Sequence, residues 1–147
     1  MNYLYLGLAD LYLPATMAAI HLHTLASDVA PAHQQLLALP FYRAVCKNDE
    51  GTLYRVGETE AGDGVYIASV KEHAEIFLRG VDSLLGVYKM PRHAVKVVPC
   101  LLENPQVGHL CSLLGHIGLH HFADLVGTRL VHNRFYDLKN ASKTVPI

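Results

Sequence analysis

Short apolar runs alternate with longer segments of helical periodicity along this chain. The first run, Tyr3–Gly7, is aromatic and aliphatic, which is typical of a buried strand. Pro14 follows at an expected first helical position, and the pattern predicts a helix over Ala15–Leu25. This helix is apolar on nearly all sides, which indicates that it packs on a sheet and is covered again by another element. A strand followed by a buried helix is the opening of an α/β fold.

The middle of the chain predicts a short helix, a hairpin and an amphipathic helix. The short helix runs from Pro31 to about Leu39. Thr52–Gly57 and Val65–Ser69 are β-rich runs joined by an acidic, glycine-containing loop, so we expect an antiparallel hairpin. Ser69 and Glu72 have the spacing of a capping box for the helix that follows. Its apolar positions, at spacings of three and four, are Phe77, Val81, Leu84, Leu85 and Tyr88.

The last third of the chain predicts two more helices. Asn104 is a suitable N-cap and Pro105 a suitable first residue for the first of them. Gly115 and Gly118 are expected to end it, and Arg129–Lys139 predicts the second. The apolar stripe of the first helix is Val107, Leu110, Cys111 and Leu114.

A valine-rich run, Ala94–Cys100, predicts a central strand buried on both faces. Together these elements predict one three-layer α/β domain over residues 1–147. Its mostly parallel sheet would contain Tyr3–Gly7 and Ala94–Cys100, with helices on both faces and an antiparallel hairpin at one side.

Composition and charge narrow the function classes. Hydrophobic residues make up 51% of the chain and charged residues 17%, which is a globular balance. Apolar stretches such as Leu11–Ile20 fall short of the roughly 20 residues that span a bilayer. Lys and Arg number 12 against 13 Asp and Glu, without a basic cluster, which argues against nucleic acid or an anionic membrane as partner.

The N-terminus and the cysteines predict a cytoplasmic protein. Met1–Leu4 lacks the basic region of a signal peptide. The three cysteines, Cys46, Cys100 and Cys111, are odd in number and match no zinc spacing, so we interpret them as free thiols in a reducing compartment.

Ligand crevices in open α/β sheets lie beyond the carboxyl ends of the strands. At those ends we expect a binding pocket lined by Asp10, Tyr12, Cys100, Glu103 and Asn104. The loop after the first strand has one glycine, a proline, an acid and no cation, so neither a P-loop nor a dinucleotide fingerprint fits it. We therefore expect no tight nucleotide binding and no cofactor.

The spacing of the histidines argues against a metal site. His21 and His23 would point about 200° apart on a helix, and Gly118 interrupts the useful spacing of His116 and His120. We therefore expect no metal site, and the role of the histidine-rich segment 109–121 stays open.

The surroundings of Cys100 argue against a reactive thiol. A catalytic Cys100 would need a low thiol pKa, whereas a neighbouring Glu103 would raise it. Cysteine is also among the most buried residue types, so packing is the simpler interpretation.

Three segments resemble a known family: Ala18–Leu22, Leu36–Tyr42 and Gly51–Gly57. They are similar to a small bacterial, Firmicutes-type family of unknown function, number 3189 among such domains, and the resemblance runs roughly through Leu114. Members carry a Gly-Gly-Thr-His-Ser-Ser-like loop between first strand and first helix. Here the matching stretch is Asp10–Ala15, which holds none of those residue types. The resemblance implies the fold and a bacterial cytoplasm, and no activity.

Two function classes follow. The favoured one is a non-catalytic binding or regulatory module; the alternative is a small-molecule enzyme with its site near Asp10, Cys100 and Glu103. We also expect self-association, or pairing with a related chain, because Leu110–Leu119 is apolar and holds no Asp, Glu, Lys or Arg. The expected interface is a helix face around Leu113, flanked by His109 and His116, whose protonation would weaken it.

Overall fold

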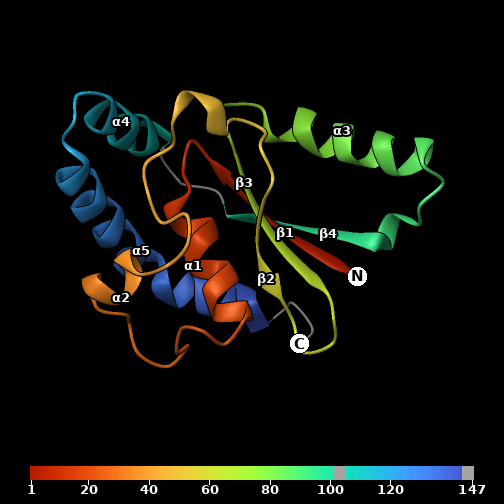
Figure 1. Cartoon of the computed structure of the whole chain (residues 1–147), viewed down its shortest axis with the longest axis horizontal. Coiled ribbons are helices and arrows are strands. Elements are labelled where there is room, and N and C mark those ends of the chain that lie inside the picture. The colour runs from red at the N-terminus through yellow and green to blue at the C-terminus, as the bar shows by residue number, and fades with distance from the viewer. Residues whose placement is uncertain (101–104, 144–147) are drawn as a thin grey trace.

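The computed structural model describes residues 1–100 and 105–143, which contain a four-stranded mixed sheet (Figure 1). The strands lie in the order β2-β3-β1-β4. β1 runs parallel to both β3 and β4, and β2 pairs antiparallel with β3 as the expected hairpin. The predicted α/β class is confirmed. The bounds are β1 (Asn2–Leu8), β2 (Tyr54–Glu58), β3 (Gly64–Val70) and β4 (Val95–Cys100).

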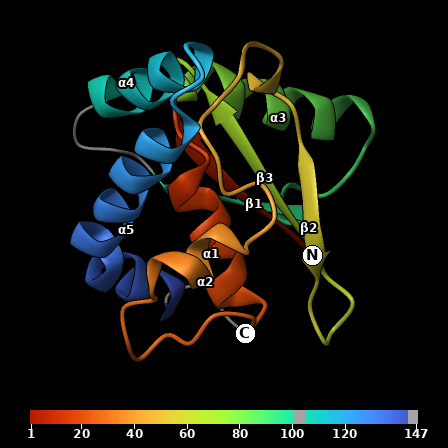
Figure 2. The same ribbon diagram turned by 60° about the vertical axis from the view of Figure 1, so that its left-hand side comes forward.

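Helices cover both faces of this sheet (Figures 1 and 2). Successive side chains of a strand point to opposite faces, so Tyr3 and Tyr5 of β1 pack in a large core with α1 and α5. Leu4 and Leu6 pack in a smaller core on the α3 side. The predicted three layers are therefore present. The helices are α1 (Tyr12–His21), α2 (His33–Leu37), α3 (Ala74–Val87), α4 (Pro105–His116) and α5 (His120–Lys143), with short 3-10 helices η1 (Lys47–Asp49) and η2 (Arg92–Ala94).

Helix α1 is the centre of the larger core, and all ten of its residues are buried. It lies between the sheet and α5, as its uniformly apolar sequence predicts. The two helices approach closely because Gly127 of α5 faces the ring of Tyr12: a Cβ atom at Gly127 would lie 2.7 Å from the ring carbons. The hydroxyl of Tyr12 also donates a hydrogen bond to Asp124 Oδ1 of α5 at 3.0 Å.

The prediction that Ala94–Cys100 is a central strand is wrong, because β4 lies at the edge of the sheet. Val95, Val97 and Val98 are only partly buried and Pro99 is exposed. A valine-rich pattern favours a strand, but here it reports neither full burial of both faces nor whether strands flank it on both sides. Pro99 was the available signal, since proline lacks the N–H that a central strand must donate.

Two predictions about α3 also need correction. Ser69 caps no helix: it lies in β3, fully buried, and its Oγ accepts a hydrogen bond from Asp10 N at 3.1 Å. The helix begins at Ala74, after His73 adopts a positive φ of 55°. Of the expected apolar face, Leu85 is buried, whereas Leu84 and Tyr88 are exposed.

Other helix boundaries differ from the expected ones. Helix α1 begins at Tyr12, two residues before Pro14, and ends at His21 because His23 turns to a positive φ of 56°. Gly115 lies inside α4, while Gly118, with a φ of 85°, follows its end as predicted. Helix α5 begins well before the expected Arg129.

Helix α2 is shorter than predicted, and the expected cap Asn104 lies outside the described residues. Within the described part of the chain, no helix combines the length and the apolarity needed to cross a membrane.

Candidate functional site

The carboxyl ends of three strands lie together at one end of the sheet. Gly7 of β1 is in register with Cys100 of β4 and with Ser69 of β3. Parallel α/β sheets bind ligands at this carboxyl end of their strands. It is also where the sequence predicts a pocket.

Asp10 lies just beyond β1 and is 2% exposed. Its carboxylate accepts hydrogen bonds from the backbone N–H groups of Tyr12 (2.8 Å) and Leu13 (3.1 Å), the first two residues of α1. Burial raises the pKa of Asp10 to about 7, against the opposing effect of these two hydrogen bonds. Asp10 therefore fills the amino end of α1 with the chain's own acceptor, where an anionic ligand would otherwise bind.

The two other described residues of the predicted pocket are also covered. Tyr12 is 2% exposed and Cys100 5% exposed. Burial, reinforced by the charge of Asp10, raises the pKa of the Cys100 thiol, so Cys100 is present as a thiol at neutral pH. The structure thus brings Asp10 and Cys100 close together, but as buried groups.

Helix α4 closes over the loop that carries Asp10. A Cβ atom at Gly108 would lie 2.3 Å from the backbone oxygen of Ala9, so the helix backbone rests directly on this loop. Glu103 and Asn104 fall outside the described residues. The predicted pocket therefore stays a prediction.

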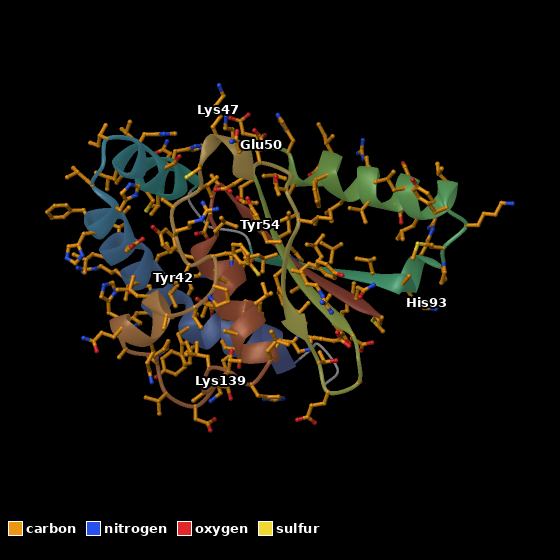
Figure 3. All side chains as sticks on the ribbon, viewed as in Figure 1. Tyr42, Lys47, Glu50, Tyr54, His93 and Lys139 are labelled. Carbon is orange, nitrogen blue, oxygen red and sulfur yellow. The ribbon has the colours of Figure 1, made fainter. Side chains whose placement is uncertain are left out.

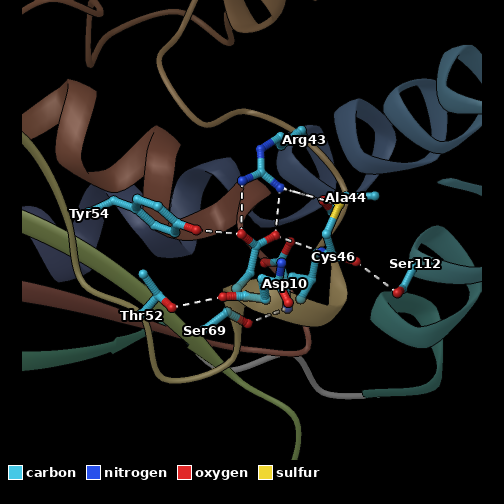
Figure 4. Close-up of polar contacts among 11 residues, drawn as sticks. Asp10, Arg43, Ala44, Cys46, Thr52, Tyr54, Ser69 and Ser112 are labelled. Atoms are coloured by element: carbon cyan, nitrogen blue, oxygen red, sulfur yellow. Dashed lines mark hydrogen bonds and ion pairs between the residues drawn. The ribbon is translucent and has the colours of Figure 1, made fainter. Parts of the chain in front are cut away.

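A second polar cluster, centred on Asp49, lies beside the carboxyl ends of the strands (Figure 4). The Asp49 side chain is 3% exposed and accepts hydrogen bonds from Arg43 Nη2 (2.9 Å), Cys46 N (2.6 Å) and the Tyr54 hydroxyl (2.5 Å). Burial alone would raise the pKa of Asp49, but these hydrogen bonds outweigh it and lower the pKa to about 2. The cluster holds segment 43–49 in place, and Gly51 N ties it to β3 through Ser69 O at 2.8 Å.

A cavity of about 260 Å³ opens between this segment and the bend that joins α4 to α5. We call it the elbow pocket. Ser112 Oγ anchors α4 to the segment by donating to Val45 O at 2.8 Å. The lining residues are Arg43, Ala44, Val45, Cys46, Ser112, Gly115, His116, His120 and Asp124.

Asp124 gives the elbow pocket its electrostatic character. The charge of Arg43 is already balanced by Asp49, and Asp124 accepts a hydrogen bond from the Tyr12 hydroxyl. Among the described residues, no Lys, Arg or His lies within ion-pairing distance of Asp124. The pocket lining thus combines apolar groups, hydrogen-bonding groups and one carboxylate that has no cationic partner in the part of the chain that the structure describes.

Two of the other hollows lined by described residues offer fewer groups that could bind a polar ligand. A groove of about 490 Å³ at the end of α1 is lined largely by aliphatic side chains, including Leu22, Leu25 and Leu39. A cavity of about 330 Å³ beside His21 borders the acidic hairpin loop, where Asp63 pairs with the N-terminal amine. Across the described residues, no three His, Cys, Asp or Glu side chains are grouped so that they could hold a metal ion.

A family model described as protein of unknown function (DUF3189) matches residues 2–145. The chain belongs to the DUF3189 family. The match confirms the resemblance drawn from the sequence and extends it to nearly the whole chain. Neither a curated protein nor a solved structure matches this DUF3189 chain significantly.

Sequence reasoning missed the elbow pocket in this DUF3189 protein. Its residues come from segment 43–46 and from positions 112–124, and no local motif relates the two stretches. The histidine spacing was the available signal: His116 and His120 do lie on one cavity, although they belong to different helices, as the break at Gly118 predicts.

Proposed function

We propose that this DUF3189 protein is a non-catalytic binding protein whose ligand occupies the elbow pocket. The observation that carries the proposal is the carboxylate of Asp124, which lines a cavity and has a hydroxyl partner but, among the described residues, no cationic one. A carboxylate held in this way favours a cationic group over an anionic one. The ligand class is therefore a small polar molecule with a protonated amine, of a size set by about 260 Å³.

The state of the other reactive groups supports binding over catalysis. Cys100 is buried with a raised thiol pKa, which disfavours the thiolate that nucleophilic catalysis needs. The carboxylate of Asp10 is engaged by two backbone N–H groups of α1. A general base must reach its substrate, and a side chain that is 2% exposed is poorly placed to do so.

The free thiols of Cys46, Cys100 and Cys111 support a cytoplasmic location, since secreted domains commonly pair their cysteines.

A thermal-shift screen tests the ligand class. The screen compares small amines, including amino acids, diamines and amino sugars, with carboxylic acids of the same size that lack an amine. We expect amines to raise the melting temperature and acids to leave it unchanged, with calorimetry giving the dissociation constant.

Neighbouring histidines provide a matched pair of variants. His120 lines the elbow pocket and His121 does not. We expect Asp124→Asn to weaken binding at least tenfold and His120→Ala to weaken it measurably, while His121→Ala binds as the wild type does. Equal binding by wild type and Asp124→Asn, or no amine binding at millimolar concentration, would refute the proposal.

A further inference from the structure

A large apolar surface lies on the outer side of the bend between α4 and α5. Figure 3 shows side chains standing out from both helices on this side of the molecule. Six large apolar residues there are 40–63% exposed. We call this surface the elbow face; its members are Leu110, Leu113, Ile117, Leu119, Phe122 and Leu125.

The spacing of these residues groups them into one apolar stripe on each helix. Leu110, Leu113 and Ile117 follow one another at intervals of three and four, so they share one face of α4 and its C-terminal turn. Phe122 and Leu125 share a face at the start of α5 in the same way. Leu119 lies in the short turn between the helices, between the two stripes in the sequence.

Charge separates the elbow face from a second exposed apolar surface on α3. Leu84 is 58% exposed, the same fraction as Leu113. However, α3 also exposes Glu75, Arg79 and Asp82, whereas residues 110–125 hold one charged residue, Asp124, which lines the elbow pocket.

We infer that the elbow face is the contact between two copies of this chain. In a two-fold interface each surface meets itself, so charges face like charges and a neutral apolar surface is self-complementary. A different partner would commonly be matched by complementary charge, which segment 110–119 does not offer.

The size of the elbow face agrees with a dimer. At the exposures given above, six side chains of the size of leucine and phenylalanine present about 600 Å² per copy. Two copies would bury about 1,200 Å², which is the lower end of the range for stable interfaces.

Sedimentation equilibrium between 5 and 500 µM tests the inference with Leu113→Glu and the matched control Leu84→Glu. We expect a dimer mass for the wild type and for Leu84→Glu at pH 7.5. Leu113→Glu should raise the constant at least a hundredfold.

Circular dichroism verifies that each variant is folded, and Ile117→Glu replaces Leu113→Glu if the latter is not. A monomer mass for the wild type at 500 µM would overturn the inference. So would dissociation caused by Leu84→Glu while Leu113→Glu stays dimeric.

Discussion

The buried carboxyl group of Asp10 makes the stability of the fold depend on pH. Burial raises its pKa from an ordinary value of 3.8 to about 7, so between these values the folded chain holds a proton that the unfolded chain has released. Stability therefore falls as pH rises from about 4 to about 7, because the unfolded state gains ionisation free energy that the folded state cannot match. Above the folded pKa the dependence ends.

The size of the effect follows from the pKa difference. A rise from 3.8 to about 7, at about 1.4 kcal/mol for each pKa unit, corresponds to about 4 kcal/mol in total. About 3 kcal/mol of this falls between pH 4.5 and pH 8. Since Asp10 is 2% exposed, solvent screening reduces this figure little.

Urea unfolding of the wild type and Asp10→Asn at several pH values isolates this contribution. The amide of the variant does not titrate, so the wild-type free energy of unfolding minus that of the variant should fall by about 3 kcal/mol from pH 4.5 to pH 8. Any constant loss from the altered hydrogen bonds to α1 cancels in this comparison.

A difference that rises with pH would refute this reasoning. It would mean that the two N–H groups at the start of α1 stabilise the Asp10 carboxylate more than burial destabilises it.

Glycines and thiols allow two further predictions. Gly108→Ala should lower the free energy of unfolding by about 2 kcal/mol or more in urea titrations, because its Cβ would lie 2.3 Å from a backbone oxygen. Gly80→Ala, in the open on α3, should raise it by up to about 1 kcal/mol. With Ellman's reagent at pH 8, Cys46 should react in the native protein, whereas Cys100 and Cys111 should react only in denaturant, since both are buried and burial raises their thiol pKa values. A native Cys46→Ser protein that still reacts rapidly with Ellman's reagent would contradict the prediction about the thiols.

Periodicity predicted well which segments form strands and helices, but it predicted poorly which strands lie next to each other. The buried strand β1 and the covered helix α1 were expected because uniform apolarity requires cover on all sides. The place of β4 was not, because a valine-rich run does not report strand order and the signal of an edge strand, Pro99, was not used. The length of α5 was underestimated because Phe122 and Leu125 lie on its exposed side and obscure the pattern of its buried face.

The candidate site was less predictable than the fold. Asp10, Tyr12 and Cys100 were predicted because the carboxyl ends of parallel strands lie together, and these residues do lie at that end of the sheet. Their burial depends on tertiary contacts, in which α4 rests on the loop beyond β1 and α5 packs on Tyr12. Arg43 and Asp49 pair within an irregular segment where no period operates.

The position of β1 at the middle of the sheet governs when this protein can fold during synthesis. Tyr3 pairs with Val65, and Asn2 pairs with Val95. The first strand therefore cannot pair until β3 and β4 have been synthesised. Helix α1 becomes fully covered later still, because its outer side is covered by α5. Contacts this distant in sequence slow folding and leave apolar surface uncovered on the nascent chain. A ribosome-bound chain that ends before α5 would therefore expose α1, and we expect chaperones that recognise apolar segments to bind it there.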